Sequence, residues 1–84
     1  MLKVLFFARV KEDLGCGALQ LEWSDAVADL DALQAYMCAE HGQRWREVLG
    51  EENMIRAVNQ TVMDANCTLQ DGDEVAFFPP VTGG

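Results

Sequence analysis

The amino-acid sequence predicts an α+β fold in which one main helix covers one face of a mixed β-sheet. Three observations lead to this prediction. Segments near both ends of the chain are rich in β-branched and aromatic residues and alternate at period two, which is typical of strands. One segment in the middle has apolar residues at helical spacing. The chain has 84 residues, enough for a single domain around one core.

The first part of the chain predicts two strands joined by a turn. Leu2–Val10 is rich in β-branched and aromatic residues, Lys11–Gly17 contains two glycines, and Ala18–Trp23 alternates as a half-buried strand does. Alternation in the first strand would place Val4, Phe6 and Ala8 on one face and Leu5, Phe7 and Arg9 on the other. We expect the two strands to form a hairpin.

A helix is predicted from about Ala26 to His41. Ser24 or Asp25 could cap its start, because either side-chain oxygen can accept a free first-turn amide, and Gly42 suits a left-handed end. The helical wheel gives an apolar arc of Val27, Leu30, Leu33, Met37 and Cys38, opposite a polar arc of Asp25, Asp29, Tyr36 and Glu40. We expect the apolar arc to lie on the sheet.

The remaining segments predict a short helix or turn and three strands. In order they are Gln43–Asn53, anchored by Trp45, then strands at Met54–Asn59 and Thr61–Met63, a turn at Leu69–Asp73 and a last strand at Glu74–Phe78. This order of elements is that of the ubiquitin-like β-grasp fold, in which the first and last strands are central, adjacent and parallel. We therefore expect a β-grasp domain at residues 1–78 and an extended, flexible tail at residues 79–84.

Composition excludes several functional classes. Fourteen acidic residues against six basic ones give a formal charge of −8, which disfavours nucleic acid and anionic membranes and favours basic protein partners. Three cysteines without metal-ligand spacing predict neither a disulfide framework nor a metal site. Charged residues follow the apolar start without a cleavage site, so export is not expected and a reducing cytoplasm is the expected compartment.

The tail is the most informative segment. Pro79 and Pro80 fix φ and lack an amide donor, so they should hold the chain extended as it leaves the sheet. Val81 and Thr82 offer modest side-chain contacts, whereas Gly83 and Gly84 could pass through a channel too narrow for other residues. A terminal flexible segment without function is the alternative that Gly-Gly alone leaves open.

Three segments carry a resemblance to a known family. Asp71–Gly84, which reads DGDEVAFFPPVTGG, closely resembles the C-terminal signature of molybdopterin synthase small subunits, which are ubiquitin-like sulfur carriers. Lys3–Ala8 and Ala57–Thr61 resemble the same family, whereas Gly15–Asn53 matches only in pattern. Ala26 stands where such proteins often have a capping threonine, which puts the cap register in doubt.

The resemblance implies a role as co-substrate rather than catalyst. A partner resembling ubiquitin-activating enzymes would use ATP to adenylate Gly84, a sulfurtransferase system would supply sulfur, and the resulting thiocarboxylate would enter the synthase large subunit. There it would give sulfur to precursor Z, cyclic pyranopterin monophosphate, in a heterotetramer. The chain itself is expected to bind no cofactor, and the catalytic site would lie on the large subunit.

The other candidate residues have either docking or structural interpretations. Leu5, Phe7 and Phe78 would remain exposed on the uncovered sheet face, and with Pro79, Pro80, Val81 and Thr82 they are the predicted partner-binding residues. Cys38 is interpreted as a core residue, and Cys16 and Cys67 as loop residues. His41 is interpreted as a capping residue, because a positive charge at the C-terminal end of a helix complements the helix dipole. Glu51, Glu52 and Asp64 could steer basic partners or be merely solvated.

Three other functions stay open. One is a different β-grasp carrier or protein modifier, serving thiazole synthesis, tRNA thiolation or conjugation. Another is an interaction module that does not use its Gly-Gly end. An autonomous enzyme is the least favoured class, because the sequence shows no nucleophile-base pair or phosphate loop.

Overall fold

The computed structural model describes residues 1–80 of the chain. Its elements, in order, are β1 (Leu2–Phe6), α1 (Ala8–Leu14), β2 (Ala18–Leu21), a 3₁₀ turn (Asp25–Val27), α2 (Leu30–His41), α3 (Gln43–Leu49), β3 (Ile55–Val58), β4 (Thr61–Met63) and β5 (Glu74–Phe78). The predicted α+β class is confirmed, and the arrangement is that of the β-grasp. The last strand of the sheet ends at Phe78, and the predicted tail is residues 79–84.

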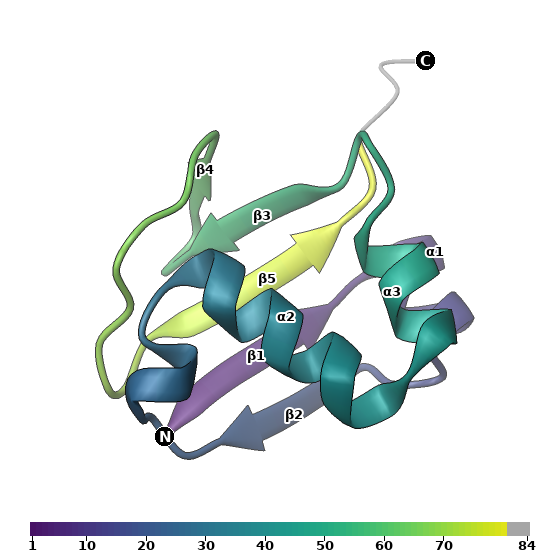
Figure 1. The fold of residues 1–84 in the computed structure, drawn as a ribbon. Helices are drawn as coiled ribbons and strands as arrows, with labels where there is room; N and C mark the ends of the chain where they lie inside the picture. The colour runs from purple at the N-terminus through teal and green to yellow at the C-terminus, as the bar shows by residue number, and fades with distance from the viewer. Residues whose placement is uncertain (81–84) are drawn as a thin grey trace.

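The sheet is mixed and five-stranded, with the order β2-β1-β5-β3-β4. β1 and β5 lie side by side and parallel, with Leu5 opposite Ala76, as the predicted fold requires. The other pairs, β1 with β2, β3 with β5 and β3 with β4, are antiparallel. The chain ends therefore contribute the two neighbouring strands at the centre of the sheet (Figure 1).

α2 covers one face of the sheet, as was predicted for the main helix (Figure 1). The predicted apolar arc of this region is buried in full: Val27, Leu30, Leu33, Met37 and Cys38. Those side chains pack with Leu2, Val4, Phe6, Val75 and Phe77 from the two central strands. Alternation within each strand decides which side chains join this core, since the residues between them point to the other face.

The prediction for residues 7–17 was wrong in part. β1 ends at Phe6, and Ala8–Leu14 forms a helix where the end of a strand and a turn were expected. Val10 and Leu14 lie four residues apart and pack inward, so the helical spacing prevails over the continued alternation. Gly15, with φ 67°, ends the helix, and its amide donates to the Glu12 carbonyl. β2 does pair antiparallel with β1, but the connection is a helix rather than a tight turn.

The predicted start of the main helix was also wrong. The Ser24 hydroxyl caps only the short 3₁₀ turn, by accepting from the Ala26 amide. The main helix begins at Leu30, where the Asp29 carboxylate accepts from the Ala32 amide at 2.7 Å. Asp29 was predicted to lie on the polar arc of the helix. Because it immediately precedes Leu30, the buried first residue of the helix, it is instead the N-cap residue.

The predictions beyond the main helix are confirmed more closely. α2 ends at His41, and Gly42 follows with φ 96°. α3 is the predicted short helix, and Trp45 is its buried anchor. Asn59 and Gln60 join β3 to β4 with positive φ, and the Asn59 side chain accepts from the Glu74 amide, which fixes the start of β5.

Candidate functional site

The face of the sheet opposite α2 is the first candidate site. The strand registers place one residue from each strand in a row across it: Ala18, Leu5, Ala76, Ala57 and Val62. All of these side chains are apolar, and none belongs to the core cluster beneath α2. Small residues at the centre and the 61% exposed Val62 at the edge give a shallow apolar surface.

Three of the residues predicted to bind a partner lie on this face: Leu5 in β1, Phe7 directly after β1, and Phe78 in β5. Phe7 is 47% exposed, whereas Leu5 and Phe78 are half-buried by their neighbours. The extended backbone of Phe7 continues the alternation of β1, so its ring follows Leu5 on the same side. Their placement fits the prediction, and partner binding itself stays a prediction.

Five further apolar residues belong to the same face but were not predicted to bind a partner: Ala18, Ile55, Ala57, Val62 and Ala76. On β3, Ile55 lies opposite Phe78 and Ala57 is only 4% exposed, whereas Val62 extends the exposed surface onto β4. Alternation was visible in these short strands, but their register to β5 was not. Without that register the sequence does not show which half of each strand shares a face with Phe78.

The tail leaves the sheet beside this face. β5 ends between β1 and β3, with the Phe7 amide donating to the Phe77 carbonyl at 3.2 Å and Ile55 opposite Phe78. Pro79 is half-buried and Pro80 exposed, so the chain reaches solvent within two residues of the strand. The predicted site residues Val81, Thr82, Gly83 and Gly84 lie outside the described residues, as does most of the predicted tail.

An aromatic cluster supports the end of β5 from below. The Phe6 ring stacks on Phe77 with centroids 5.8 Å apart, and it meets Trp45 edge-on at 5.3 Å. The His41 ring stacks on Trp45 with ring centroids 3.8 Å apart. His41 closes α2 as expected, and this stacking gives it a packing role that the sequence did not indicate. The cluster fixes β5 two residues before the prolines.

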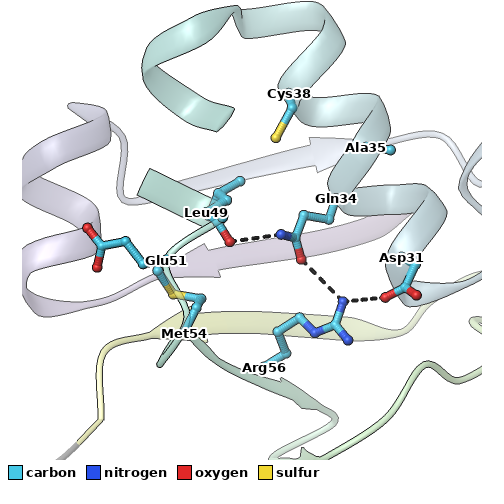
Figure 2. Close-up of a pocket in the computed structure, with 9 residues that line it drawn as sticks. Asp31, Gln34, Ala35, Cys38, Leu49, Glu51, Met54 and Arg56 are labelled. Atoms are coloured by element: carbon cyan, nitrogen blue, oxygen red, sulfur yellow. Dashed lines mark hydrogen bonds and ion pairs between the residues drawn. The ribbon is translucent and has the colours of Figure 1, made fainter. Parts of the chain in front are cut away.

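A groove of about 460 Å³ lies between α2, the end of α3 and β3, as Figure 2 shows. Arg56 crosses it and donates to Asp31 at 2.7 Å and to Gln34 at 3.2 Å. Gln34 in turn donates to the Leu49 carbonyl at 2.8 Å. These polar groups bind one another, and together they brace α2 against the segment that leads into β3. We interpret the groove as structural rather than as a ligand site.

Nucleophilic and metal-binding groups do not gather in the described part of the chain. Residues 1–80 contain no cluster of three or more side chains that could hold a metal ion. All three cysteines are free, with Cys38 buried and Cys16 and Cys67 half-buried in loops, as predicted. Burial raises the pKa of the Cys38 thiol, and the nearby Arg46 offsets this only in part. Cys38 is thus held in the unreactive thiol form.

Comparisons with known proteins agree with this geometry. The model of the ThiS family matches residues 4–84. Two molybdopterin synthase sulfur carrier subunits match over their whole length and that of this chain. The protein from Haemophilus influenzae is 44% identical over 84 residues, and that from Escherichia coli K12 is 46% identical over 87 residues.

Solved structures share the fold. SAMP1 from Haloferax volcanii superposes with a TM-score of 0.74 at 22% identity, covering 99% of this chain and 98% of that one, which bears on the fold alone. A chain from a complex of subunits 1 and 2 of the Helicobacter pylori 26695 molybdopterin-converting factor has a TM-score of 0.69. It is 30% identical, with 99% of this chain and 97% of that chain covered.

Proposed function

Since this chain belongs to the ThiS family, we propose that it is the sulfur carrier subunit of a molybdopterin synthase, with the carboxyl group of Gly84 as its working group. The observation that carries the proposal is full-length identity of 44–46% to two proteins of that name. The exit of the chain from β5 beside an exposed apolar face supports it.

The proposed chemistry takes place at the end of the chain. The Gly84 carboxylate attacks the α-phosphate of ATP on an adenylating partner, which releases pyrophosphate and leaves an acyl-adenylate. A sulfur donor then displaces AMP and leaves a thiocarboxylate, whose sulfur passes to precursor Z in the large subunit. Hydrolysis restores the carboxylate, so the chain is a recycled co-substrate. A glycine at this position leaves the carbonyl carbon unhindered.

The described residues support delivery of such a tail. The braced end of β5 gives the tail a fixed starting point, because Phe77 is stacked in the core and Phe78 is paired with β3. Burial of the neighbouring apolar face against a partner would remove apolar surface from water, and this would stabilise the complex. Docking the face would thus place the start of the tail at the entrance to the partner's active site.

The proposed partners are the large subunit, an adenylating enzyme that resembles ubiquitin-activating enzymes, and a sulfurtransferase system. The large subunit is supported by the Helicobacter pylori neighbour, which was solved in a complex of subunits 1 and 2. We propose a cytoplasmic location, in keeping with three free cysteines. In residues 1–80 no helix has the length and apolar character needed to cross a bilayer.

The test is the oxygen-to-sulfur exchange itself. The protein is incubated with ATP, sulfide and an adenylating enzyme of this class, and its intact mass and C-terminal peptide are recorded. We expect one oxygen of Gly84 to be replaced by sulfur, and no exchange in a variant that lacks Gly83 and Gly84. That variant should keep the circular dichroism of the full chain, because both residues follow the last strand.

The remaining alternatives predict different results. A carrier for thiazole synthesis or tRNA thiolation would also form the thiocarboxylate, but would fail to restore growth of a strain that lacks its molybdopterin synthase small subunit. An interaction module would show no oxygen-to-sulfur exchange under conditions in which a control carrier is thiolated. It would also still bind its partner after removal of Gly83 and Gly84. Either result would reject the proposal.

A further inference from the structure

The outer edge of β2 offers unpaired backbone groups. β2 is the last strand on its side of the sheet, and no strand of residues 1–80 lies beyond it. The Phe6 amide donates to the Gly17 carbonyl, so Gly17, Leu19 and Leu21 face β1 while Ala18 and Gln20 direct their amides and carbonyls outward. Only the weak thiol donor of Cys16 contacts the Ala18 carbonyl, at 3.4 Å.

This edge lacks three of the features that usually protect an exposed strand, although β2 is short, with four residues. Edge strands are commonly blocked by lysine, proline or a bulge. Residues 18–23 contain neither lysine nor proline, and the register with β1 runs without a bulge. A second extended chain could therefore add to the sheet here, displacing only the weak contact of the Cys16 thiol with the Ala18 carbonyl.

A groove of about 410 Å³ runs beside the edge, between β2 and α2. Its apolar walls come from Leu21, Trp23, Val27 and Tyr36. Trp23 and Tyr36 are 38% and 37% exposed, among the largest exposed side chains of residues 1–80. The Trp23 indole donates to the Leu69 carbonyl at 3.0 Å, so this wall is already fixed in the free chain.

Charge decides what kind of chain fits the groove. The segment from residue 12 to residue 43, which supplies both β2 and α2, has seven carboxylates and no lysine or arginine. Glu22, Asp25 and Glu40 are exposed, and none of them takes part in an ion pair within residues 1–80. The ammonium group of Met1, another residue of the groove, is paired with Asp71. A second copy of a chain with charge −8 would be repelled.

We propose that the β2 edge and its groove bind an extended, basic segment of a partner protein, which pairs with Ala18 and Gln20 and inserts an apolar side chain between Trp23 and Tyr36. Backbone pairing supplies the affinity, and the groove and carboxylates select apolar and basic side chains in alternation. This surface differs from the apolar face that flanks the tail, although Ala18 belongs to both: its backbone lies at the edge and its side chain on the open face.

The site leaves the tail free. Leu21 pairs with Leu2, and Met1 lines the groove, so the groove lies at the start of β1. The tail follows β5 and leaves the sheet beside the other end of β1, where the Phe7 amide donates to the Phe77 carbonyl. Because β1 and β5 are parallel, the groove and the start of the tail lie at opposite ends of the central strands. The backbone pairing at Ala18 lies closer to the tail, since Ala18 is opposite Leu5.

The test uses an acetylated and amidated peptide of alternating valine and lysine, about six residues long, the usual length of a strand. Amide chemical shifts of the full-length protein are recorded during titration. We expect saturable shifts at residues 18–23 and at Tyr36, and a much weaker response to the same peptide with glutamate in place of lysine. Removal of Gly83 and Gly84 should leave the binding unchanged, which separates this site from the carrier function.

Two pairs of variants provide the controls. Gln20→Pro removes an outward amide, and should weaken binding roughly tenfold, whereas Gln20→Thr keeps the amide and should stay close to the parent. Tyr36→Ala removes one wall and should weaken binding, whereas Tyr36→Phe should not. Non-specific charge attraction would instead give shifts spread over the surface and equal in all four variants. That result, or the absence of saturable shifts, overturns the proposal.

Discussion

Phe6 and Phe7 are adjacent aromatic residues with opposite environments. Phe6 is 1% exposed and stacks on Phe77, whereas Phe7 is 47% exposed at the end of the open sheet face. Period-two alternation predicted this difference, because neighbouring strand residues point to opposite faces. The exposure of Phe7 next to the start of the tail makes it the best single test of the docking face.

Phe7→Ala should separate partner binding from stability. Loss of an exposed ring should change the free energy of unfolding by less than about 0.5 kcal/mol. Loss of a buried aromatic contact in the complex should weaken binding of the large subunit by about 2 kcal/mol, roughly 30-fold. Calorimetry with the purified large subunit measures the affinity, and urea denaturation measures the stability.

Tyr36→Ala is the matched control for that experiment. Tyr36 is an exposed aromatic residue on α2, on the other side of the sheet from the docking face. Its removal should leave affinity for the large subunit unchanged. Equal binding by the Phe7→Ala variant and the parent would show that the open face is not the interface.

At the scale of elements, the sequence predicted the main helix, α3 and the strands in their correct order, but it missed α1 and misplaced the start of α2. The main helix and the terminal strands were found because each has several apolar residues in register with its period. α1 was missed because Val10 prolongs the apolar strand pattern and only Val10 and Leu14 mark the helical spacing. The start of α2 was misplaced because Ser24, Asp25 and Asp29 are all capable caps, and tertiary packing of Leu30 selects among them.

The end of α1 depends on the conformation of Gly15. Its φ of 67° is left-handed, and a Cβ there would meet no atom within 4 Å. Gly15→Ala should therefore cost about 1 kcal/mol through backbone strain alone, without a clash. Gly15→Asn should cost less, since asparagine tolerates this conformation. Urea denaturation of both variants checks the order, and an alanine variant as stable as the parent would contradict it.

At the scale of the whole molecule, the charge of −8 acts on association rather than on the fold. Glu51, Glu52 and Asp64 were the acidic residues considered for steering. Glu51 is paired with Arg9 at 3.0 Å, whereas Glu52 and Asp64 are exposed without an ion pair among residues 1–80. The sequence shows the net charge but not which carboxylates form ion pairs. The pair of Arg9 and Glu51 joins α1 to the segment after α3, and these are far apart in the sequence.

The rate of association with the large subunit should fall as salt rises from about 0.05 M to about 0.5 M, because the Debye length shortens. The dissociation rate should change little. Glu52→Gln and Glu51→Gln each remove one negative charge, and Glu51→Gln also leaves Arg9 unbalanced, so both should slow association at low salt. Surface plasmon resonance measures both rates, and an association rate independent of salt would rule out steering.

The parallel pairing of β1 with β5 also has a consequence for how the chain folds. β5 joins β1 to β3, and its partners in β1 lie far away in the sequence, as in the pair of Lys3 and Glu74. Bringing such distant residues together costs conformational entropy before their contacts can compensate for it. We therefore expect the centre of the sheet to form late, after the local helices and the β3–β4 turn.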